Sequence, residues 1–246
     1  KLILGNSQGI AFMISKKIFL NIFKNSAISF LQTEKKTAAP STTIALPAIA
    51  LVVSGGHTLL LRVDDLYTWE HLGETRDDAV GEAFDKVARL LELPYPGGPE
   101  IEKLSKEGNK EAIDFPRPML HDKNYDFSFS GLKTAVLYHL RDTKDANKAD
   151  IAASFQEAAI DVLAKKTMKA AEDFGAQTVL IAGGVAASKA LRSRIQKNCE
   201  KRGLTFLMPQ MQYNTDNAAM IGAAALMAAL KGEEGFPLEA QGRVRM

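Results

Sequence analysis

The alternation of helical and strand patterns in the C-terminal part of the chain constrains the fold more than any other feature of the sequence. A long helical pattern over residues 150–175 leads into the apolar run TVLIA at 178–182. A second helical pattern, which carries Leu191 and Ile195, leads into another apolar run at 204–208. Successive strands joined by a helix usually pair in parallel, with a right-handed crossover. The pattern therefore predicts an α/β fold.

Upstream patterns add further strands and helices. The run AIALVV at 48–53 is apolar and rich in branched side chains, which is typical of a buried strand. The segment 77–93 carries apolar residues at helical spacing and is expected to be an amphipathic helix. The long helix is expected to point Phe155 and Phe174 inward and to end at Gly175. The remaining expected elements are strands at 58–63 and 66–72 and helices at 99–109 and 132–142.

Residues 1–46 differ in composition from the rest of the chain. The segment mixes Ile, Phe and Leu with lysines, and Glu34 is its only carboxylate. This composition fits an amphipathic helix on a membrane surface or a targeting segment. It also fits a poorly specified extension or a damaged reading frame, which we favour. We therefore expect an atypical extension at 1–46, a core at 47–232 and a C-terminal tail at 233–246.

The overall composition is that of an ordinary globular protein, with 46% hydrophobic and 24% charged residues. The net charge of +2 gives no global field that would attract nucleic acid or a membrane. The single cysteine, Cys199, excludes an intramolecular disulfide and a cysteine-rich zinc site. No apolar run reaches the roughly 18 residues of a membrane span. The chain begins with Lys1 rather than methionine, so we expect a fragment or a processed product.

Pairs of glycines recur at three ends of strands or loops, and they are the first indication of a binding site. The pairs are Gly55-Gly56, Gly97-Gly98 and Gly183-Gly184. Glycine lets a ligand approach backbone N–H groups closely, and the start of a helix favours phosphate. The first pair is expected to open a hairpin and the third a helix, so both suit a nucleotide. The alternative is that each pair is only a tight turn.

The phosphate motifs of other nucleotide-binding folds are missing. Neither the P-loop pattern nor the Rossmann glycine fingerprint occurs in the sequence. A nucleotide would therefore be held by hairpin turns and helix starts, as it is in the group that contains actin, the sugar kinases and Hsp70.

Two acidic residues allow both a structural and a functional interpretation. Asp85 lies off the apolar stripe of its helix, next to the favourable i, i+4 pair of Glu82 and Lys86. It could accept hydrogen bonds from ribose hydroxyls or simply face solvent. Asp216 begins the last helical pattern, where it could cap the helix or bind a metal beside phosphate. One carboxylate alone does not define a metal site.

The segment 124–136 is rich in aromatic and hydroxyl residues and carries Lys133. It could contact a polynucleotide, or it could contribute core residues and a helix cap. On physical grounds we favour the core and the cap.

Six motifs together resemble one known family. In order they are LVVSGGHT, DDAVGEAFDKVARLLELPYPGGP, DFSFSGLKTAV, ASFQEAAIDVL, IAGGVAAS and YNTDNAAMIGAAA. They resemble the tRNA threonylcarbamoyladenosine synthase (TsaD) family over about residues 47–230. The resemblance implies an actin-like (ASKHA, ribonuclease H-like) fold of two lobes, of which the first is incomplete here. It also implies transfer of a threonylcarbamoyl group from threonylcarbamoyl-AMP to the adenosine beside the tRNA anticodon, with release of AMP.

The same resemblance implies a set of site residues but no particular catalytic side chain. Asp85 and Gly98 would contact the nucleoside, and Asp216 would be a ligand of one divalent metal ion, which we expect to be iron(II), with zinc as the alternative. Ser188 would contact the base or ribose, at a position where the family usually has Asn. Serine keeps a hydrogen-bonding group but has less reach. The phosphate and acyl end would lie against Val52, Val53, Ser54, Gly55 and Gly56.

Residues 1–46 depart from the family's pattern. They contain neither its His-x-x-x-His metal pair nor its N-terminal hairpin. With one metal ligand remaining, we expect metal affinity to fall steeply and this chain alone to have little activity. The implied reaction is an acyl transfer in which metal charge and backbone N–H groups stabilise the oxyanion.

The resemblance further implies a cytoplasmic protein, or an organellar one if residues 1–46 are a targeting sequence. Its partners would be a related actin-like subunit and a P-loop ATPase. Two alternatives remain open, namely a catalytically inactive nucleotide-binding fragment or scaffold derived from the family and a phosphotransferase of the same superfamily.

Overall fold

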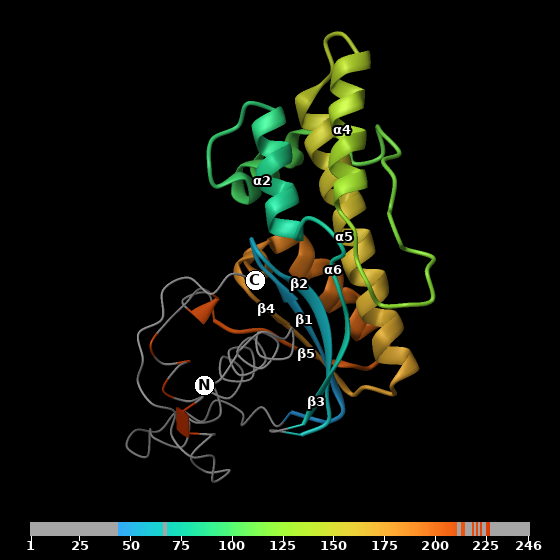
Figure 1. Ribbon diagram of the computed structural model, residues 1–246, viewed down its shortest axis with the longest axis vertical. Coiled ribbons are helices and arrows are strands. Elements are labelled where there is room, and N and C mark those ends of the chain that lie inside the picture. Colours follow the sequence, from blue (N-terminus) through green and yellow to red (C-terminus); the bar gives the residue numbers. More distant parts are fainter. Residues whose placement is uncertain are drawn as a thin grey trace, which may run out of the picture. The chain divides into compact units, whose positions relative to one another are not determined.

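The computed structural model describes residues 44–65 and 68–210, together with positions 213, 214, 218, 220, 222, 225 and 226. Residues Ile44–Asn214 form one compact unit. A second unit comprises Lys1–Thr43 and Thr215–Met246, and most of it lies outside the described residues. The unit Ile44–Asn214 contains the elements described below (Figure 1).

A mixed five-stranded sheet, in the order β3-β2-β1-β4-β5, is the centre of this unit. β1 pairs antiparallel with β2, and β2 pairs antiparallel with β3. β4 pairs in parallel with both β1 and β5, which confirms the predicted parallel pairing and the α/β class. The strands are β1 (Ala48–Val53), β2 (Thr58–Val63), β3 (Trp69–Glu74), β4 (Thr178–Ala182) and β5 (Thr205–Leu207).

Helices α5 and α6 lie against one face of the sheet, and α2 and α4 lie near the end of the sheet where β1 finishes (Figure 1). The α-helices are α2 (Val80–Leu90), α3 (Gly97–Leu104), α4 (Ser130–Asp142), α5 (Lys148–Asp173) and α6 (Lys189–Glu200). Two short 3-10 helices are η1 (Ser105–Glu107) and η2 (Gly184–Ala187). Among the described residues, no helix combines the length and apolarity needed to cross a membrane.

The core forms where the apolar stripes of these helices meet the sheet. Ile49 and Leu51 of β1 are fully buried in one cluster with Phe155 of α5, as the sequence pattern predicts. Phe84 of α2 meets the Phe155 ring edge-on at 4.9 Å, which is a favourable aromatic geometry. Phe174 is only partly buried against this cluster, because it is the C-cap of α5.

Some predicted boundaries differ from the structure. The helix expected at 77–93 begins at Val80, whose N–H donates to Thr58 Oγ1 of β2 at 2.9 Å. Asp77 is not part of this helix, because its carboxylate binds the start of α4. The strand expected at 66–72 runs from Trp69 to Glu74, and residues 66 and 67 lie outside the described residues. Gly175 ends α5 with a positive φ of 59°, as predicted.

Candidate functional site

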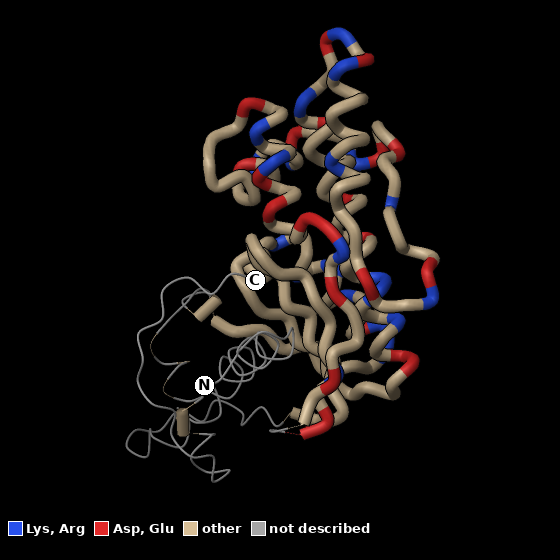
Figure 2. The backbone as a smooth tube through the Cα atoms, in the orientation of Figure 1, with Lys and Arg blue, Asp and Glu red and all other residues tan. Residues whose placement is uncertain are grey.

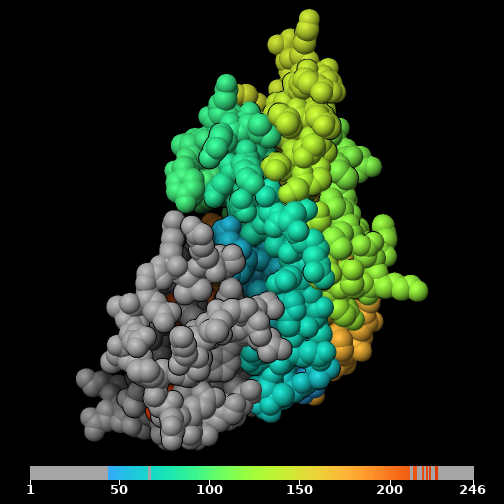
Figure 3. Space-filling view, in the orientation of Figure 1, coloured from blue at the N-terminus to red at the C-terminus, as the bar shows by residue number. Residues whose placement is uncertain are grey.

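The turn between β1 and β2 carries the first glycine pair and is fixed from within. Ser54 Oγ accepts the N–H groups of Gly56 at 3.3 Å and His57 at 3.0 Å. Gly81 of α2 packs directly on this turn, since a Cβ at Gly81 would lie 2.6 Å from Ser54 O. The turn is therefore held rigidly while Gly55 and Gly56 themselves stay exposed. In the space-filling view, atoms of the first hairpin reach the surface next to the segment that contains α2 and α3 (Figure 3).

The end of β4 lies beside this turn. Gly183 has a φ of 99°, and a Cβ there would lie 2.2 Å from Val53 O. Only glycine fits that conformation and that close approach to β1. The glycine pair at 183–184 opens the 3-10 helix η2 and not an α-helix, which corrects the sequence interpretation. The α-helix begins at Lys189, after Ser188, whose Oγ accepts the Leu191 N–H at 3.4 Å.

Asp85 and Glu102 connect the next two helices to the same region. Asp85 Oδ1 accepts the Gly97 N–H at 2.8 Å and so caps the start of α3. Glu102 of α3 accepts the Ala190 N–H at 3.1 Å and so holds the start of α6. A closed series of contacts therefore runs from the β1–β2 turn through α2, α3 and the start of α6, and returns to β1 through η2.

The glycines around this series fall into two groups. Gly81, Gly97 and Gly183 are packed tightly, because an added Cβ would meet other atoms at 2.6, 2.5 and 2.2 Å respectively. The second group, here called the open glycines, consists of Gly55, Gly56, Gly98 and Gly184. An added Cβ at any of them would meet no atom of the described residues within 4 Å, and none has a positive φ. Neither packing nor backbone conformation therefore requires glycine at the open positions.

The open glycines also carry unused hydrogen-bond donors. Among the described residues, the N–H groups of Gly55, Gly98 and Gly184 have no hydrogen-bond partner. Gly98 lies in the first turn of α3, where backbone N–H groups have no partner within the helix. These donors could bind an anion that approaches the backbone closely.

The other predicted site residues differ in what they can offer a ligand. Val52 and Val53 are 5% and 0% exposed, so only their backbone could take part. Asp85 is partly buried; its Oδ1 is engaged with Gly97, whereas its Oδ2 accepts no hydrogen bond from the described residues. The Ser188 hydroxyl accepts an N–H and can still donate. Asp216 lies outside the described residues.

Two neighbouring carboxylates that the sequence analysis did not single out organise the start of α2. Asp77 accepts the N–H groups of Phe129 at 2.8 Å and Ser130 at 3.2 Å, and so caps α4. Asp78 binds Lys86 Nζ at 2.7 Å and Lys133 Nζ at 3.0 Å. Burial alone would raise the pKa of Asp78, but the hydrogen bonds from both lysines hold it below its usual value.

The structure shows how the segment 124–136 contributes to the core. Phe127 and Phe129 are fully buried, so the interpretation as core is confirmed. The expectation that the segment also supplies a helix cap is wrong, because the side chain that caps α4 is Asp77, which lies outside the segment. Lys133 bonds to Asp78. The expected pair of Glu82 and Lys86 is also confirmed, at 2.9 Å. The partners of Asp77 and Lys133 lie more than 50 residues away along the chain, so local pattern could not reveal them.

The predicted metal centre is not formed by the described residues. Within the part of the chain that the structure describes, no group of three or more His, Cys, Asp or Glu side chains could hold a metal ion. These residues therefore do not fit a metal site on their own.

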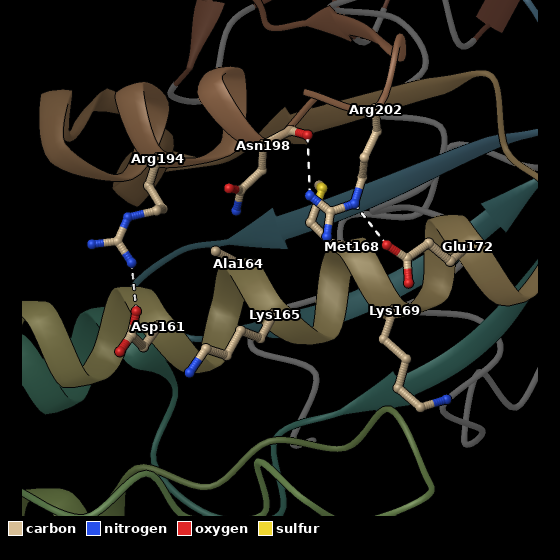
Figure 4. A pocket seen from close by; sticks show the side chains of 9 residues that line it. All are labelled: Asp161, Ala164, Lys165, Met168, Lys169, Glu172, Arg194, Asn198 and Arg202. Carbon is tan, nitrogen blue, oxygen red and sulfur yellow. Dashed lines mark hydrogen bonds and ion pairs between the residues drawn. The ribbon is translucent and has the colours of Figure 1, made fainter. Parts of the chain in front are cut away.

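A groove of about 320 Å³ lies elsewhere, between α5 and α6 (Figure 4). Arg194 of α6 and Arg202, two residues after α6, cross it to Asp161 and Glu172 of α5, at 2.5 and 2.6 Å. It contains none of the predicted site residues, and its arginines already have carboxylate partners. We therefore place the candidate site at the open glycines and not in this groove.

The strand order of the sheet and the helices on its face define an α/β lobe of the actin-like (ASKHA) class. The crystal structure of T. kodakarensis HypF has a similar fold, with a TM-score of 0.60 and 15% sequence identity over 87% of this chain and 36% of that chain. The model of the TsaD family, tRNA N6-adenosine threonylcarbamoyltransferase, matches residues 25–223. The chain therefore belongs to the TsaD family.

Two curated relatives show the extent of the match. A tRNA N6-adenosine threonylcarbamoyltransferase of Thermosipho africanus is 55% identical over 188 residues, which are 76% of this chain and 57% of the relative. One of Clostridium botulinum strain 657 is 47% identical over 230 residues, 92% of this chain and 66% of the relative. The chain thus spans between half and two thirds of the length of these relatives. The family match begins inside the segment 1–46, and the boundary at residue 46 stays a prediction.

Proposed function

We propose that this chain is part of a tRNA adenosine threonylcarbamoyltransferase. It would take the threonylcarbamoyl group from threonylcarbamoyl-AMP and place it on the adenosine next to the tRNA anticodon. Membership of the TsaD family supports this proposal. The observation from the structure that carries the proposal is the set of open glycines. Within the described chain, neither packing nor a positive φ explains why these positions are glycine.

The proposal gives each part of the site a role in binding the adenylate. The phosphate and acyl end lie against the β1–β2 turn, where the Gly55 N–H has no partner in the part of the chain that the structure describes and can donate. The ribose hydroxyls donate to the unused Oδ2 of Asp85, whose position is fixed by the bond from its Oδ1 to Gly97. Gly98 leaves room for the nucleoside, and the Ser188 hydroxyl donates to the base or ribose.

The reaction that suits this binding mode is an acyl transfer. The N6 amine of adenosine attacks the carbamoyl carbon, a C–N bond forms, the C–O bond to the AMP phosphate breaks, and the amine loses a proton. Backbone N–H groups at the turn stabilise the negative charge that develops on the carbonyl oxygen. The iron(II) or zinc that the family resemblance implies would include Asp216 among its ligands. No step above depends on it, because the described residues do not form its site.

A transfer assay tests the proposal. The purified chain would be combined with threonylcarbamoyl-AMP, unmodified tRNA and the two proposed partners, the actin-like subunit and the P-loop ATPase. Mass spectrometry should show a threonylcarbamoyl group on the tRNA, and AMP release should depend on the tRNA. We expect little transfer without the partners.

Two variants make this assay specific. Asp85→Ala should slow transfer at least about tenfold, because hydrogen bonds to a charged group contribute about 1.5–3 kcal/mol. Glu82→Gln, on the same helix, should not slow it, since Glu82 bonds only to Lys86 among the described residues. Adenylate binding without any transfer would point to a non-catalytic scaffold. ATP-dependent phosphorylation of a small substrate would point to a phosphotransferase.

A further inference from the structure

Helix α6 and the two residues after it carry a larger excess of positive charge than any other part of the described chain. Residues 189–202, KALRSRIQKNCEKR, contain six basic residues and one acidic residue, whereas the whole chain has a net charge of only +2. Over most of the described chain both signs of charge are interspersed (Figure 2). The excess on α6 therefore calls for a physical explanation.

The arginines and the lysines of this segment differ in what they contact. Each arginine is held by the protein: Arg192 by Ala186 O at 2.6 Å, Arg194 by Asp161 at 2.5 Å and Arg202 by Glu172 at 2.6 Å. The pairs of Arg194 and Arg202 cross the groove between α5 and α6 (Figure 4). Lys189, Lys197 and Lys201 are exposed, and their side chains make no ion pair or hydrogen bond with any described residue.

These lysines, here called the α6 lysine ridge (Lys189, Lys197 and Lys201), lie on one side of the helix. With Ser193 they are spaced four residues apart, so they follow one ridge of the helix. At 1.5 Å per residue the ridge is about 18 Å long. Its first member directly follows Ser188, a predicted adenylate-binding residue. The ridge therefore leads away from the candidate site along the surface.

Folding alone does not account for this arrangement. Lys197 and Lys201 are like charges at i, i+4, which destabilise a helix. The helix dipole favours cations in the last turn but opposes Lys189, which lies in the first turn. By contrast, Glu82–Lys86 on α2 and Lys169–Asp173 on α5 pair opposite charges at the same spacing. An anionic partner would offset the unfavourable charge on α6.

We propose that the α6 lysine ridge binds the phosphate backbone of the tRNA whose adenosine reacts at the candidate site. This inference rests on the proposed function. Lysine is suited to the role, because its ammonium group is a point charge on a long stem that contacts phosphate without reading sequence. An RNA that follows the ridge would have its phosphates held beside Ser188, where the reacting adenosine must enter.

The test compares two triple variants of the 246-residue chain for binding to an unmodified tRNA transcript. The ridge variant is Lys189→Gln, Lys197→Gln and Lys201→Gln. The control variant is Lys106→Gln, Lys123→Gln and Lys144→Gln, which removes three lysines that are also exposed and lack partners among the described residues. Both lose the same net charge, and thermal unfolding would confirm that both remain folded.

At about 0.1 M salt the ridge variant should bind the tRNA roughly tenfold more weakly or worse, and the control should change by less than about twofold. The slope of log K against log salt concentration should fall by about 2 for the ridge variant, because each phosphate contact contributes about 0.7–0.9. Equal losses in the two variants would overturn the inference and leave the proposed function standing.

An AMP titration of the same proteins separates the remaining outcomes. The ridge variant should bind AMP as the wild type does, because the ridge does not touch the adenylate. A wild-type chain that binds AMP but no tRNA would overturn both the ridge and the tRNA part of the proposed function. A ridge variant that loses tRNA and AMP together would also overturn the inference, since its effect would then be on the site itself.

Discussion

At the scale of single residues, the glycines carry the clearest information. The sequence presents three similar Gly-Gly pairs, but the structure assigns their members to different tasks. Gly97 and Gly183 pack against Asp85 and Val53, respectively, and hold the site together. At their neighbours Gly98 and Gly184, no atom of the described part of the chain lies within 4 Å of the Cβ position, and no hydrogen bond from it engages their N–H groups. Each of these pairs therefore combines one structural glycine with one that is available to a ligand.

Adjacent substitutions at the third pair should separate these tasks. Gly183→Ala should lower the free energy of unfolding by about 1–3 kcal/mol, because alanine is strained at a positive φ and its Cβ would clash with Val53 O. Gly184→Ala should leave stability nearly unchanged, since no atom of residues 44–65 or 68–210 lies within 4 Å of its Cβ position. Urea unfolding would measure both. A Gly184→Ala loss as large as that of Gly183→Ala would contradict this division.

At the scale of elements, α2 connects the site to the rest of the lobe. Its start packs on the β1–β2 turn through Gly81, and its middle caps α3 through Asp85. Asp78, just before α2, is only 13% exposed and bonds to Lys86 of α2 and Lys133 of α4. The position of the site therefore depends on how firmly α2 and α4 are held together.

The ion pairs of Asp78 should make part of the stability depend on pH. Because the folded-state pKa of Asp78 is lowered, its contribution is complete above the ordinary Asp pKa of about 3.9 and is lost as the pH falls through the lowered value. Asp78→Asn should reduce the free energy of unfolding by about 1–3 kcal/mol at pH 7.

Urea unfolding at pH 7 and at pH 3 would measure this contribution. The difference between wild type and Asp78→Asn should narrow at pH 3. Asp114→Asn, at a fully exposed carboxylate, should have no measurable effect at either pH. If the difference in free energy of unfolding between wild type and Asp78→Asn is the same at pH 3 and pH 7, the ion pairs of Asp78 do not contribute to stability as proposed.

At the scale of the whole molecule, the sequence predicts the sheet better than the connections between helices. Residues 48–53, 58–63 and 178–182 form strands as expected, because their apolar, branched runs are local features. The predicted start of α2 was wrong by three residues, because Asp77 caps α4 instead of beginning α2. The groups that Asp77 binds lie more than 50 residues along the chain. The role of Glu102 was missed for the same reason, since its partner Ala190 is 88 residues away.

The candidate site was predictable to the extent that it consists of glycines beside strands. Gly55, Gly98 and Ser188 were identified from their motifs, and the structure links the elements that carry them through one series of contacts. Which glycines are open and which are packed depends on distant atoms, so the sequence could not show it. The binding roles of these residues and of Asp216 remain predictions.

The central claim is that an adenylate binds at the open glycines, and calorimetric titration with AMP tests it most directly. The wild type and Gly131→Ala, whose Cβ would make only an ordinary contact with Pro118, should bind AMP equally well. Gly98→Ala should fold normally but bind at least about tenfold more weakly, a loss of about 1.4 kcal/mol, because its methyl group would occupy the space of the ligand. AMP binding that is absent from the wild type, or unchanged in Gly98→Ala, would contradict the account.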